Sequence, residues 1–251
     1  MRIFPLNIAH RGASSLAPEN TLESFKKAIQ LKCDGIELDV HMTKDNELIV
    51  IHDEFLNRTT NGTGSVKNLT LNEIKELDAG THFSNKFKGS KIPTLKEVLD
   101  LIAPYNLLLD LEIKQWEPEI EKNVINMIQS YNYEKKTIIT SFNPTCILKC
   151  KQISKDVKTG LLAFFLQNDP LELKKSLEID YLCLDLNYVK LFSQKDIDTL
   201  KKNDLKILTF TVDKKQDMLY MIKHKVDGII TNKPQLLNLL KYNPFNFMRF
   251  K

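Results

Sequence analysis

The stretch Gly35-Ile36-Glu37-Leu38-Asp39-Val40 alternates carboxylate and aliphatic side chains. Successive residues of a β-strand point to opposite faces, so Glu37 and Asp39 share one face and the aliphatic residues share the other. The stretch Leu109-Asp110-Leu111-Glu112-Ile113-Lys114 repeats this alternation, with two acids and a lysine on one face. In a closed barrel, strands of this kind pack their aliphatic face against helices and turn their polar face into the lumen.

Strand-like runs of this length recur along the whole chain. Short apolar and β-branched runs alternate with longer segments of helical period, which is typical of repeated βα units and a parallel sheet. The predicted strands lie near residues 6–9, 35–40, 107–113, 137–140, 157–162, 181–184, 206–211 and 227–230. Apolar residues at three- and four-residue spacing predict helices within segments 21–31, 94–102, 117–131, 170–177, 193–202, 214–223 and 234–240.

Eight such units in 251 residues predict a (β/α)8 barrel, or TIM barrel, built as a single domain over residues 1–251. A doubly wound open α/β sheet is the alternative, because periodicity alone does not show that a sheet closes. Segment 54–91 is too long for a simple βα connection and contains the turn-rich run Asn61-Gly62-Thr63-Gly64-Ser65. We interpret it as a small inserted cap that follows the strand ending in His52-Asp53 and faces the substrate. An excursion with a purely structural role is the alternative.

The composition is that of an ordinary globular chain, with 42% hydrophobic and 27% charged residues. The 36 basic and 32 acidic residues leave a net charge of +4. A mixed and mildly basic surface favours small anionic substrates weakly and gives no basis for binding nucleic acid.

Three features bear on location. The longest apolar run, residues 161–166, is far shorter than the roughly 18 residues of a membrane span. His10 leaves no room before it for a signal peptide of about 15 to 30 residues, so we expect a cytoplasmic protein if Met1 is the natural start. The four cysteines lack Cys-x-x-Cys spacing, which favours thiols in a reducing compartment over a zinc site or a disulfide framework.

Carboxylates dominate the polar faces of the two alternating strands. Glu37, Asp39 and Glu112 would meet near one end of the lumen and repel each other unless something positive lies among them. One divalent cation is the simplest remedy, and ligands that are all oxygen favour Mg²⁺ or Ca²⁺ over zinc. A structural salt-bridge network with nearby bases is the alternative. Asp110 is explained equally well as a buried residue that orients others by hydrogen bonding.

His10 and His52 each follow an apolar strand-like run. A neutral imidazole can take and give a proton near physiological pH, so both are candidates for acid and base catalysis, and a satisfied core histidine is the alternative for each. Arg11 offers a planar guanidinium that can donate two parallel hydrogen bonds, and Lys114 offers a compact positive charge. Both suit an anionic reacting group, and phosphate is the anion that fits best. Glu19-Asn20-Thr21 opens a predicted helix, and an N-cap at one of its last two residues is the ordinary explanation.

With these residues placed, the chain resembles the glycerophosphodiester phosphodiesterase family. The similar motifs run in family order from near the start of the chain to near its end, so the resemblance covers the whole length. Each motif is weak alone, and the ordered set is highly specific. The motifs are Ala9-His10-Arg11-Gly12, Ala17-Pro18-Glu19-Asn20-Thr21, Gly35-Ile36-Glu37-Leu38-Asp39-Val40, Ile51-His52-Asp53, Leu111-Glu112-Ile113-Lys114 and Val226-Asp227-Gly228-Ile229-Ile230-Thr231-Asn232.

The resemblance implies a metal-dependent TIM-barrel hydrolase with an inserted segment after the His52-Asp53 strand. Its reaction would convert a glycerophosphodiester into sn-glycerol 3-phosphate and an alcohol. A glycerol hydroxyl beside the ester would attack phosphorus, giving a cyclic phosphate that water then opens. The implied metal ligands are Glu37, Asp39 and Glu112, and the implied proton carriers are His10 and His52. Arg11 and Lys114 match phosphate-binding positions, and Glu19 and Asp53 are the implied supporting acids.

Two short stretches depart from the family pattern. Phe210-Thr211-Val212-Asp213 stands where the family often has Trp-Thr-Val-Asn, and Thr231-Asn232 stands where Thr-Asp is common. The first departure keeps Phe210 as an aromatic wall for the glycerol or the alcohol, and it puts the fine specificity in doubt. The second follows the last predicted strand, where it is placed to alter a hydrogen bond beside the site.

The expected partner is a small glycerophosphodiester such as glycerophosphocholine or glycerophosphoethanolamine. One alternative keeps the site but acts on a lysophospholipid at a membrane surface, because residues 242–251 are aromatic and basic. Packing of this tail on the barrel is the simpler expectation for it. The other alternative is a non-catalytic barrel that binds phosphodiesters as a sensor or scaffold.

Overall fold

Eight parallel strands close into a barrel in the computed structural model, which describes residues 4–115 and 117–242. β1 pairs in parallel with both β2 and β9, so the sheet has no open edge between its first and last parallel strands. This closure confirms the predicted TIM barrel and excludes the open sheet. The barrel strands are β1 (Leu6–His10), β2 (Gly35–Met42), β4 (Leu108–Ile113), β5 (Thr137–Ser141), β6 (Lys158–Ala163), β7 (Tyr181–Asp185), β8 (Lys206–Phe210) and β9 (Gly228–Thr231).

A ninth strand lies outside the barrel proper. β3 (Leu48–Val50) pairs antiparallel with the far end of β2, with Val40 opposite Val50. The apolar run that contains β3 is visible in the sequence, but its pairing is not. The pairing returns the chain to the carboxyl end of β2, so that His52 follows two residues later near the mouth of the barrel.

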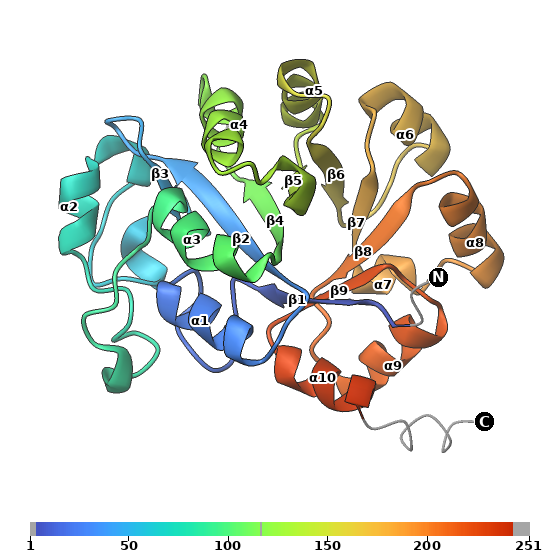
Figure 1. Cartoon of the computed structure of the whole chain (residues 1–251), viewed down its shortest axis with the longest axis horizontal. Helices are drawn as coiled ribbons and strands as arrows, with labels where there is room; N and C mark the ends of the chain where they lie inside the picture. The colour runs from blue at the N-terminus through green and yellow to red at the C-terminus, as the bar shows by residue number, and fades with distance from the viewer. Residues whose placement is uncertain (1–3, 116, 243–251) are drawn as a thin grey trace.

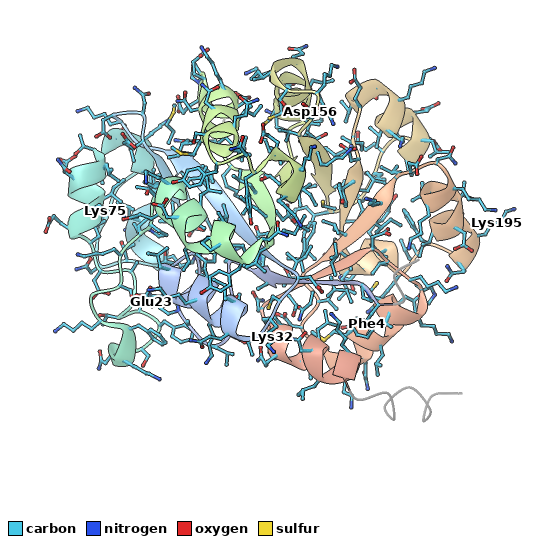
Figure 2. The ribbon with its side chains drawn as sticks, viewed as in Figure 1. Phe4, Glu23, Lys32, Lys75, Asp156 and Lys195 are labelled. Atoms are coloured by element: carbon cyan, nitrogen blue, oxygen red, sulfur yellow. The ribbon has the colours of Figure 1, made fainter. Side chains whose placement is uncertain are left out.

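Helices surround the strands on the outside of the barrel (Figure 1). Capping boxes at Thr21, Thr94 and Ser193 start three of them, because each hydroxyl accepts a backbone N–H that the first turn leaves unpaired. Charged helix side chains such as that of Lys195 point away from the barrel (Figure 2). The helices are α1 (Leu22–Gln30), α2 (Leu71–Glu76), α3 (Leu95–Ile102), α4 (Ile120–Ser130), α5 (Pro144–Ile153), α6 (Pro170–Leu177), α7 (Leu186–Val189), α8 (Gln194–Lys202), α9 (Lys215–Lys223) and α10 (Pro234–Tyr242), and the 3-10 turns are η1 (Leu56–Arg58), η2 (Val66–Asn68), η3 (Asn85–Phe87), η4 (Ala103–Tyr105) and η5 (Glu134–Lys136).

The segments predicted as helices each contain one, whereas α2, α5 and α7 were not predicted from the sequence. The longest of these three is α5. Its inward face is made by Cys146, Ile147 and Cys150, and the two cysteines do not stand out as an apolar stripe. All four cysteines are buried free thiols. None of the described helices is long and apolar enough to cross a membrane.

The apolar core has two layers. Aliphatic residues on the outer face of the strands pack against the helices in two clusters, one that includes Leu38 and Leu111 and another that includes Leu182 and Ile207. A smaller cluster that includes Ile8, Cys183 and Leu208 fills the inside of the barrel. The lumen is therefore packed over part of its length, and its polar residues gather toward the carboxyl ends of the strands.

Segment 54–91 lies beside β3 and builds an apolar cluster of its own. Leu56, Val66 and Ile74 pack there against Ile49 and Ile51. Figure 1 shows α2, within this segment, at the outer edge of the molecule near β3. That the segment caps bound substrate stays a prediction. The C-terminal residues 243–251, on which the membrane-surface alternative depends, lie outside the described residues.

Packing of the helical layer predicts that two leucines differ in how much stability the protein loses when each is replaced by alanine. Leu99 in α3 is fully buried, whereas Leu239 in α10 is 64% exposed. Leu99→Ala should lower the free energy of unfolding in urea by about 2 to 5 kcal/mol, because it leaves a cavity between α3 and the strands. Leu239→Ala, the matched control, should stay within about 0.5 kcal/mol of the unaltered protein. Equal losses in the two variants would contradict this packing.

Candidate active site

A cavity of about 450 Å³ opens at the carboxyl ends of the barrel strands. It brings together most of the residues singled out in the sequence, although they come from different strands and loops. Asp39 is buried and does not line the cavity. Glu19 and Asp53 do not line it either, but they contact the lining residues Arg11 and His52. The lining residues are His10, Arg11, Glu37, His52, Asp110, Glu112, Lys114, Thr140, Phe142, Leu162, Phe164, Asp185, Phe210, Thr211 and Ile230.

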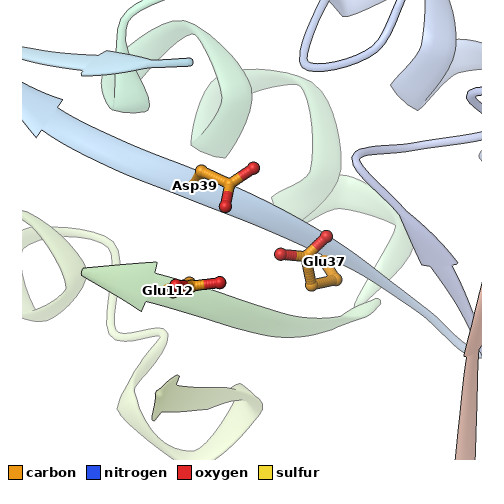
Figure 3. Close-up of side chains that lie close together, drawn as sticks. All are labelled: Glu37, Asp39 and Glu112. Atoms are coloured by element: carbon orange, nitrogen blue, oxygen red, sulfur yellow. The ribbon is translucent and has the colours of Figure 1, made fainter. Parts of the chain in front are cut away.

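Three carboxylates converge at the carboxyl ends of β2 and β4. In the strand register Asp39 lies opposite Glu112, and Glu37 lies one step deeper on β2. One carboxylate oxygen from each of the three lies within 4.8 Å of the others (Figure 3). The alternation observed in the sequence therefore produces the predicted cluster of inward acids.

The electrostatics of this cluster fit a divalent cation. Burial, reinforced by the charge of Asp39, raises the pKa of Glu112 to about 8 and also raises the pKa of Glu37 well above its usual range. Burial alone would raise the pKa of Asp39 too, but Arg11 holds it below its ordinary value. The Oδ1 atom of Asp39 is buried and has no hydrogen-bond donor among the described residues. An oxygen-lined pocket of mutually repelling acids is the donor set that Mg²⁺ and Ca²⁺ prefer.

The loop after β1 holds two of these acids in place. Arg11 and Gly12 both have positive φ, 53° and 78°, and the resulting tight turn aims the Arg11 backbone N–H at Glu37 Oε2, 2.8 Å away. A Cβ at Gly12 would lie 2.7 Å from the backbone carbon of Ser24, so the turn requires glycine. Arg11 Nε lies 3.3 Å from Asp39 Oδ2.

Asn20 and Thr21 have separate tasks that the sequence did not distinguish. Thr21 caps α1, as its hydroxyl accepts the N–H of Ser24. Asn20, with a positive φ of 55°, donates from Nδ2 to Asp39 Oδ2 at 2.8 Å. The amide of Asn20 thus helps to orient Asp39. Its left-handed conformation, which asparagine tolerates, differs from the extended conformation of an N-cap residue such as Thr21.

Both predicted histidines are anchored through Nδ1. His10 Nδ1 lies 2.7 Å from Asn232 Oδ1, and His52 Nδ1 lies 2.6 Å from Asp53 Oδ1. Burial, and next the charge of Arg11, lower the pKa of His10 to about 4, so its ring is neutral near pH 7. Each ring keeps Nε2 for contacts on the cavity side, where His10 Nε2 lies 3.9 Å from a Glu37 oxygen.

Lys114 joins the second histidine to the carboxylates. Its Nζ lies 2.8 Å from Glu112 Oε1 and 3.2 Å from His52 Nε2. An ammonium group can only donate, so His52 Nε2 accepts this hydrogen bond and Nδ1 carries the ring proton toward Asp53. Lys114 and Arg11 thus place two fixed positive charges beside the acids, on the polar side of the cavity.

Arg58, which the sequence analysis overlooked, connects the outer supports of the site. It donates through Nε to Asp53 Oδ2 at 2.7 Å and through Nη2 to Asp53 Oδ1 at 3.0 Å. It also donates through Nη1 and Nη2 to the two oxygens of Glu19, at 2.9 and 2.8 Å. Glu19 in turn accepts from Arg11 Nη1 at 2.8 Å. One guanidinium from the inserted segment therefore braces both His52 and Arg11, and an arginine five residues after Asp53 was its sequence signal.

Asp110 lies on β4 two residues before Glu112, opposite Glu37 in the strand register. Thr140 Oγ1 donates to it at 3.0 Å, and burial raises the pKa of Asp110 to about 7. It does not belong to the group of three acids whose oxygens converge. The interpretation of Asp110 as a buried hydrogen-bonding residue accounts for these contacts.

The far side of the cavity is apolar. Phe142, Phe164 and Phe210 form a cluster in which ring centroids lie 5.2 to 6.1 Å apart. Asp185, opposite Phe210 in the strand register, adds a carboxylate to this side. The sequence pointed only to Phe210, because Phe142 and Phe164 follow their strands without a motif around them. The cavity thus presents most of its charged groups on one side, and aromatic rings with Asp185 beside them on the other.

Comparisons with known proteins agree with this geometry and confirm the resemblance. The model of the glycerophosphoryl diester phosphodiesterase family matches residues 10–236. A glycerophosphodiester phosphodiesterase of Caldanaerobacter subterraneus subsp. tengcongensis is 45% identical over 94% of this chain and 98% of its own length. A glycerophosphodiester phosphodiesterase of Bacillus subtilis is 34% identical over 94% of this chain and 86% of its own length.

Solved structures give the same result. A phosphodiesterase of Oleispira antarctica, in complex with the product sn-glycerol-3-phosphate, has a TM-score of 0.86 at 27% identity and covers 96% of this chain and 98% of its own. A glycerophosphodiester phosphodiesterase of Agrobacterium tumefaciens has a TM-score of 0.84 at 27% identity, covering 92% of this chain and 98% of its own.

The bracing by Arg58 predicts a change in acid stability. Hydrogen bonds from Arg58 and the charge of Arg11 overcome burial and lower the pKa of Glu19 from 4.5 to about 2. A depressed carboxyl pKa stabilises the fold above the unfolded value, and this stability is lost as the pH falls toward 2. Arg58→Ala should therefore lower the free energy of unfolding at pH 6 and lose less of it between pH 5 and pH 3 than the unaltered protein does.

Urea unfolding across this pH range measures the difference. Lys122→Ala is the control, because it removes the partner of the exposed Glu119 and should leave the pH dependence nearly unchanged. An Arg58→Ala curve parallel to that of the unaltered protein would show that Arg58 does not hold the pKa of Glu19 down.

Proposed function

The chain belongs to the glycerophosphoryl diester phosphodiesterase family, and we propose that it hydrolyses glycerophosphodiesters to sn-glycerol 3-phosphate and an alcohol. One observation carries the proposal: three converging carboxylates and two Nδ1-anchored histidines share one cavity with two cations. Such a set can neutralise a phosphodiester and move protons on both sides of the phosphorus. Deacylated phospholipids such as glycerophosphocholine and glycerophosphoethanolamine are the proposed substrates.

Glu37, Asp39 and Glu112 would hold one divalent cation, Mg²⁺ or Ca²⁺. The fit rests on their converging oxygens and on Asp39 Oδ1, which has no hydrogen-bond donor among the described residues and lies 3.9 Å from Lys114 Nζ. A cation bound there supplies Lewis-acid stabilisation of charge on the phosphoryl oxygens. Asn20 and the backbone N–H of Arg11 keep two of the three carboxylates oriented toward the same point.

His10 and His52 are the proposed proton carriers. One imidazole removes the proton of the glycerol hydroxyl beside the ester, and the oxygen of that hydroxyl attacks phosphorus. The other imidazole protonates the departing alcohol. The products of this step are the free alcohol and a cyclic glycerol phosphate. Water then opens the ring with the roles of the histidines exchanged. Asp53 supports His52 in both steps of the reaction, because its carboxylate accepts a hydrogen bond from Nδ1 at 2.6 Å.

Arg11 and Lys114 would bind the non-bridging phosphoryl oxygens. Their side chains lie on the same wall as the histidines and are already oriented by acids, Arg11 by Glu19 and Lys114 by Glu112. A held guanidinium loses less side-chain entropy when it binds an anion. Phe210 would provide the apolar wall for the glycerol or the alcohol on the opposite side.

The other interpretations of the sequence have less support. The lysophospholipid alternative depends on the tail, residues 243–251 of which lie outside the described residues. A non-catalytic barrel would have no need of two histidines whose Nε2 atoms lie beside Glu37 and Lys114. A cytoplasmic location stays a prediction from the sequence.

Metal dependence is the first test of the proposed function. Purified protein incubated with glycerophosphocholine and Mg²⁺ or Ca²⁺ should release sn-glycerol 3-phosphate, and excess chelator should stop the release because the three acids would repel substrate phosphate and each other. Restoring the metal should restore turnover. Equal activity in excess chelator would contradict the metal site while leaving the hydrolase assignment open to the histidine test.

Removal of either proton carrier is the second test. His10→Ala and His52→Ala should each reduce kcat by about 10² to 10⁴-fold, with circular dichroism and thermal unfolding close to those of the unaltered protein. His224→Ala is the matched control, because His224 stacks on Tyr220 at the end of α9, away from the cavity. A change of only a few fold in His10→Ala or His52→Ala would remove that residue from its assigned role.

A further inference from the structure

Asp213, Asn232 and His10 form a hydrogen-bonded series where the barrel closes. They follow or end β8, β9 and β1, which are neighbours in the sheet. The loop that carries Asp213 is tied to β9, because the backbone N–H of Val212 donates to the carbonyl of Ile230 at 3.0 Å. Asp213 is not among the residues that line the cavity.

The carboxylate of Asp213 decides which way the amide of Asn232 faces. Asp213 Oδ1 accepts from Thr231 Oγ1 at 2.9 Å and from the Asn232 backbone N–H at 2.8 Å. Asp213 Oδ2 lies 2.6 Å from Asn232 Nδ2. An ionised carboxylate has acceptors only, so the NH₂ group of Asn232 must face Asp213 and its oxygen must face the other way.

The oxygen of Asn232 then decides where His10 carries its proton. Ser14 Oγ donates to Asn232 Oδ1 at 2.8 Å, and His10 Nδ1 lies 2.7 Å from the same oxygen. A carbonyl oxygen accepts only, so Nδ1 of the neutral ring must carry the hydrogen. The lone pair of His10 is thereby placed on Nε2, on the side of Glu37.

The two histidines reach the same tautomer by different means. His52 donates directly to a carboxylate, that of Asp53, and needs no further partner for this purpose. His10 donates to an amide, which could equally present its NH₂ group if nothing fixed it. Asp213 and Asn232 are also two positions at which the sequence departs from the family pattern, and the structure places them in direct contact.

We propose that Asp213 is a positioning residue for the reaction: by fixing the amide of Asn232, it holds His10 in the Nδ1–H tautomer and leaves Nε2 free for proton transfer. The catalytic part of this inference rests on the proposed function, and the tautomer part does not. Asp213 acts entirely through Asn232. Its loss should therefore affect the proton-transfer step more than the binding of substrate.

Reversing the polarity of the pair tests this chain of contacts. In Asp213→Asn the introduced amide can turn its NH₂ group toward Asn232, which favours a flipped Asn232 amide and a His10 ring protonated at Nε2. kcat should fall by about 10²-fold or more, with a much smaller change in KM, because the proton-accepting nitrogen faces the wrong way. The double variant D213N/N232D gives His10 a carboxylate acceptor and gives the amide introduced at position 213 a partner, so it should recover much of the lost kcat.

Nitrogen-15 NMR of the His10 ring near pH 7 reads the tautomer directly. The unaltered protein and D213N/N232D should show a protonated Nδ1, and D213N should show a protonated Nε2. Asp227→Asn is the matched control. Asp227 lies just before β9, accepts the backbone N–H of Ile207 and pairs with Lys201, so the substitution removes a carboxylate charge and its ion pair without touching His10. Its kcat and its His10 tautomer should remain those of the unaltered protein.

Three results would overturn the proposal. The first is an unaltered protein with His10 protonated at Nε2, a measurement that needs no variant to fold. The second is a D213N enzyme that loses activity while His10 keeps its Nδ1 proton, as a structural role alone would produce. The third is a double variant no more active than D213N. Absence of turnover on any glycerophosphodiester by the unaltered protein would defeat the proposed function instead, and the NMR comparison would still decide the role of Asp213.

Discussion

Mutual repulsion among buried carboxylates is the constraint on which this site depends. Glu37, Asp39 and Glu112 are held within reach of one another by the register of β2 and β4, where water cannot screen them fully. Backbone hydrogen bonds on both sides of each strand prevent the acids from moving apart. The surroundings must therefore supply positive charge and hydrogen-bond donors, and most of the contacts around the cavity do so.

Those compensating groups come from the loops that follow the strands. The turn after β1 directs a backbone N–H to Glu37 and a guanidinium to Asp39, and Asn20 adds an amide donor. Lys114 reaches Glu112 from the end of β4. The compensation is incomplete, because Asp39 Oδ1 keeps no hydrogen-bond donor among the described residues and the pKa of Glu112 stays raised. This remaining imbalance is what a bound cation would relieve.

Further contacts hold in place the residues that surround the three acids. Arg58 binds Glu19 and Asp53 at once, so the loop after β1 and the loop after β3 share one cation. On the opposite side, Asn232 contacts His10 Nδ1 and is itself held by Asp213, whereas His52 Nδ1 contacts the carboxylate of Asp53 directly. Ion pairs as exposed as Arg58 contribute little to stability singly, but a network that fixes geometry serves a reaction in which small displacements are costly.

Local patterns in the sequence were enough to predict the barrel, its eight parallel strands and the inward acids, because period-two alternation and repeated βα units need no distant partner. They also indicated which histidines and cations would lie near the acids. These residues occur at the ends of predicted strands, and the carboxyl ends of parallel strands meet at one rim of the barrel. The pairing of β3 and the roles of Asn20 and Phe142 emerged only from the folded chain, because their partners lie far away along the sequence. The α5 helix was missed for a local reason, since two cysteines on its inward face do not stand out as an apolar stripe. Arg58 has one partner nearby, Asp53, but its second partner, Glu19, is 39 residues away. The contact between Asp213 and Asn232 is of the same kind: β8 and β9 bring together two residues 19 positions apart, and only their geometry shows that one orients the other.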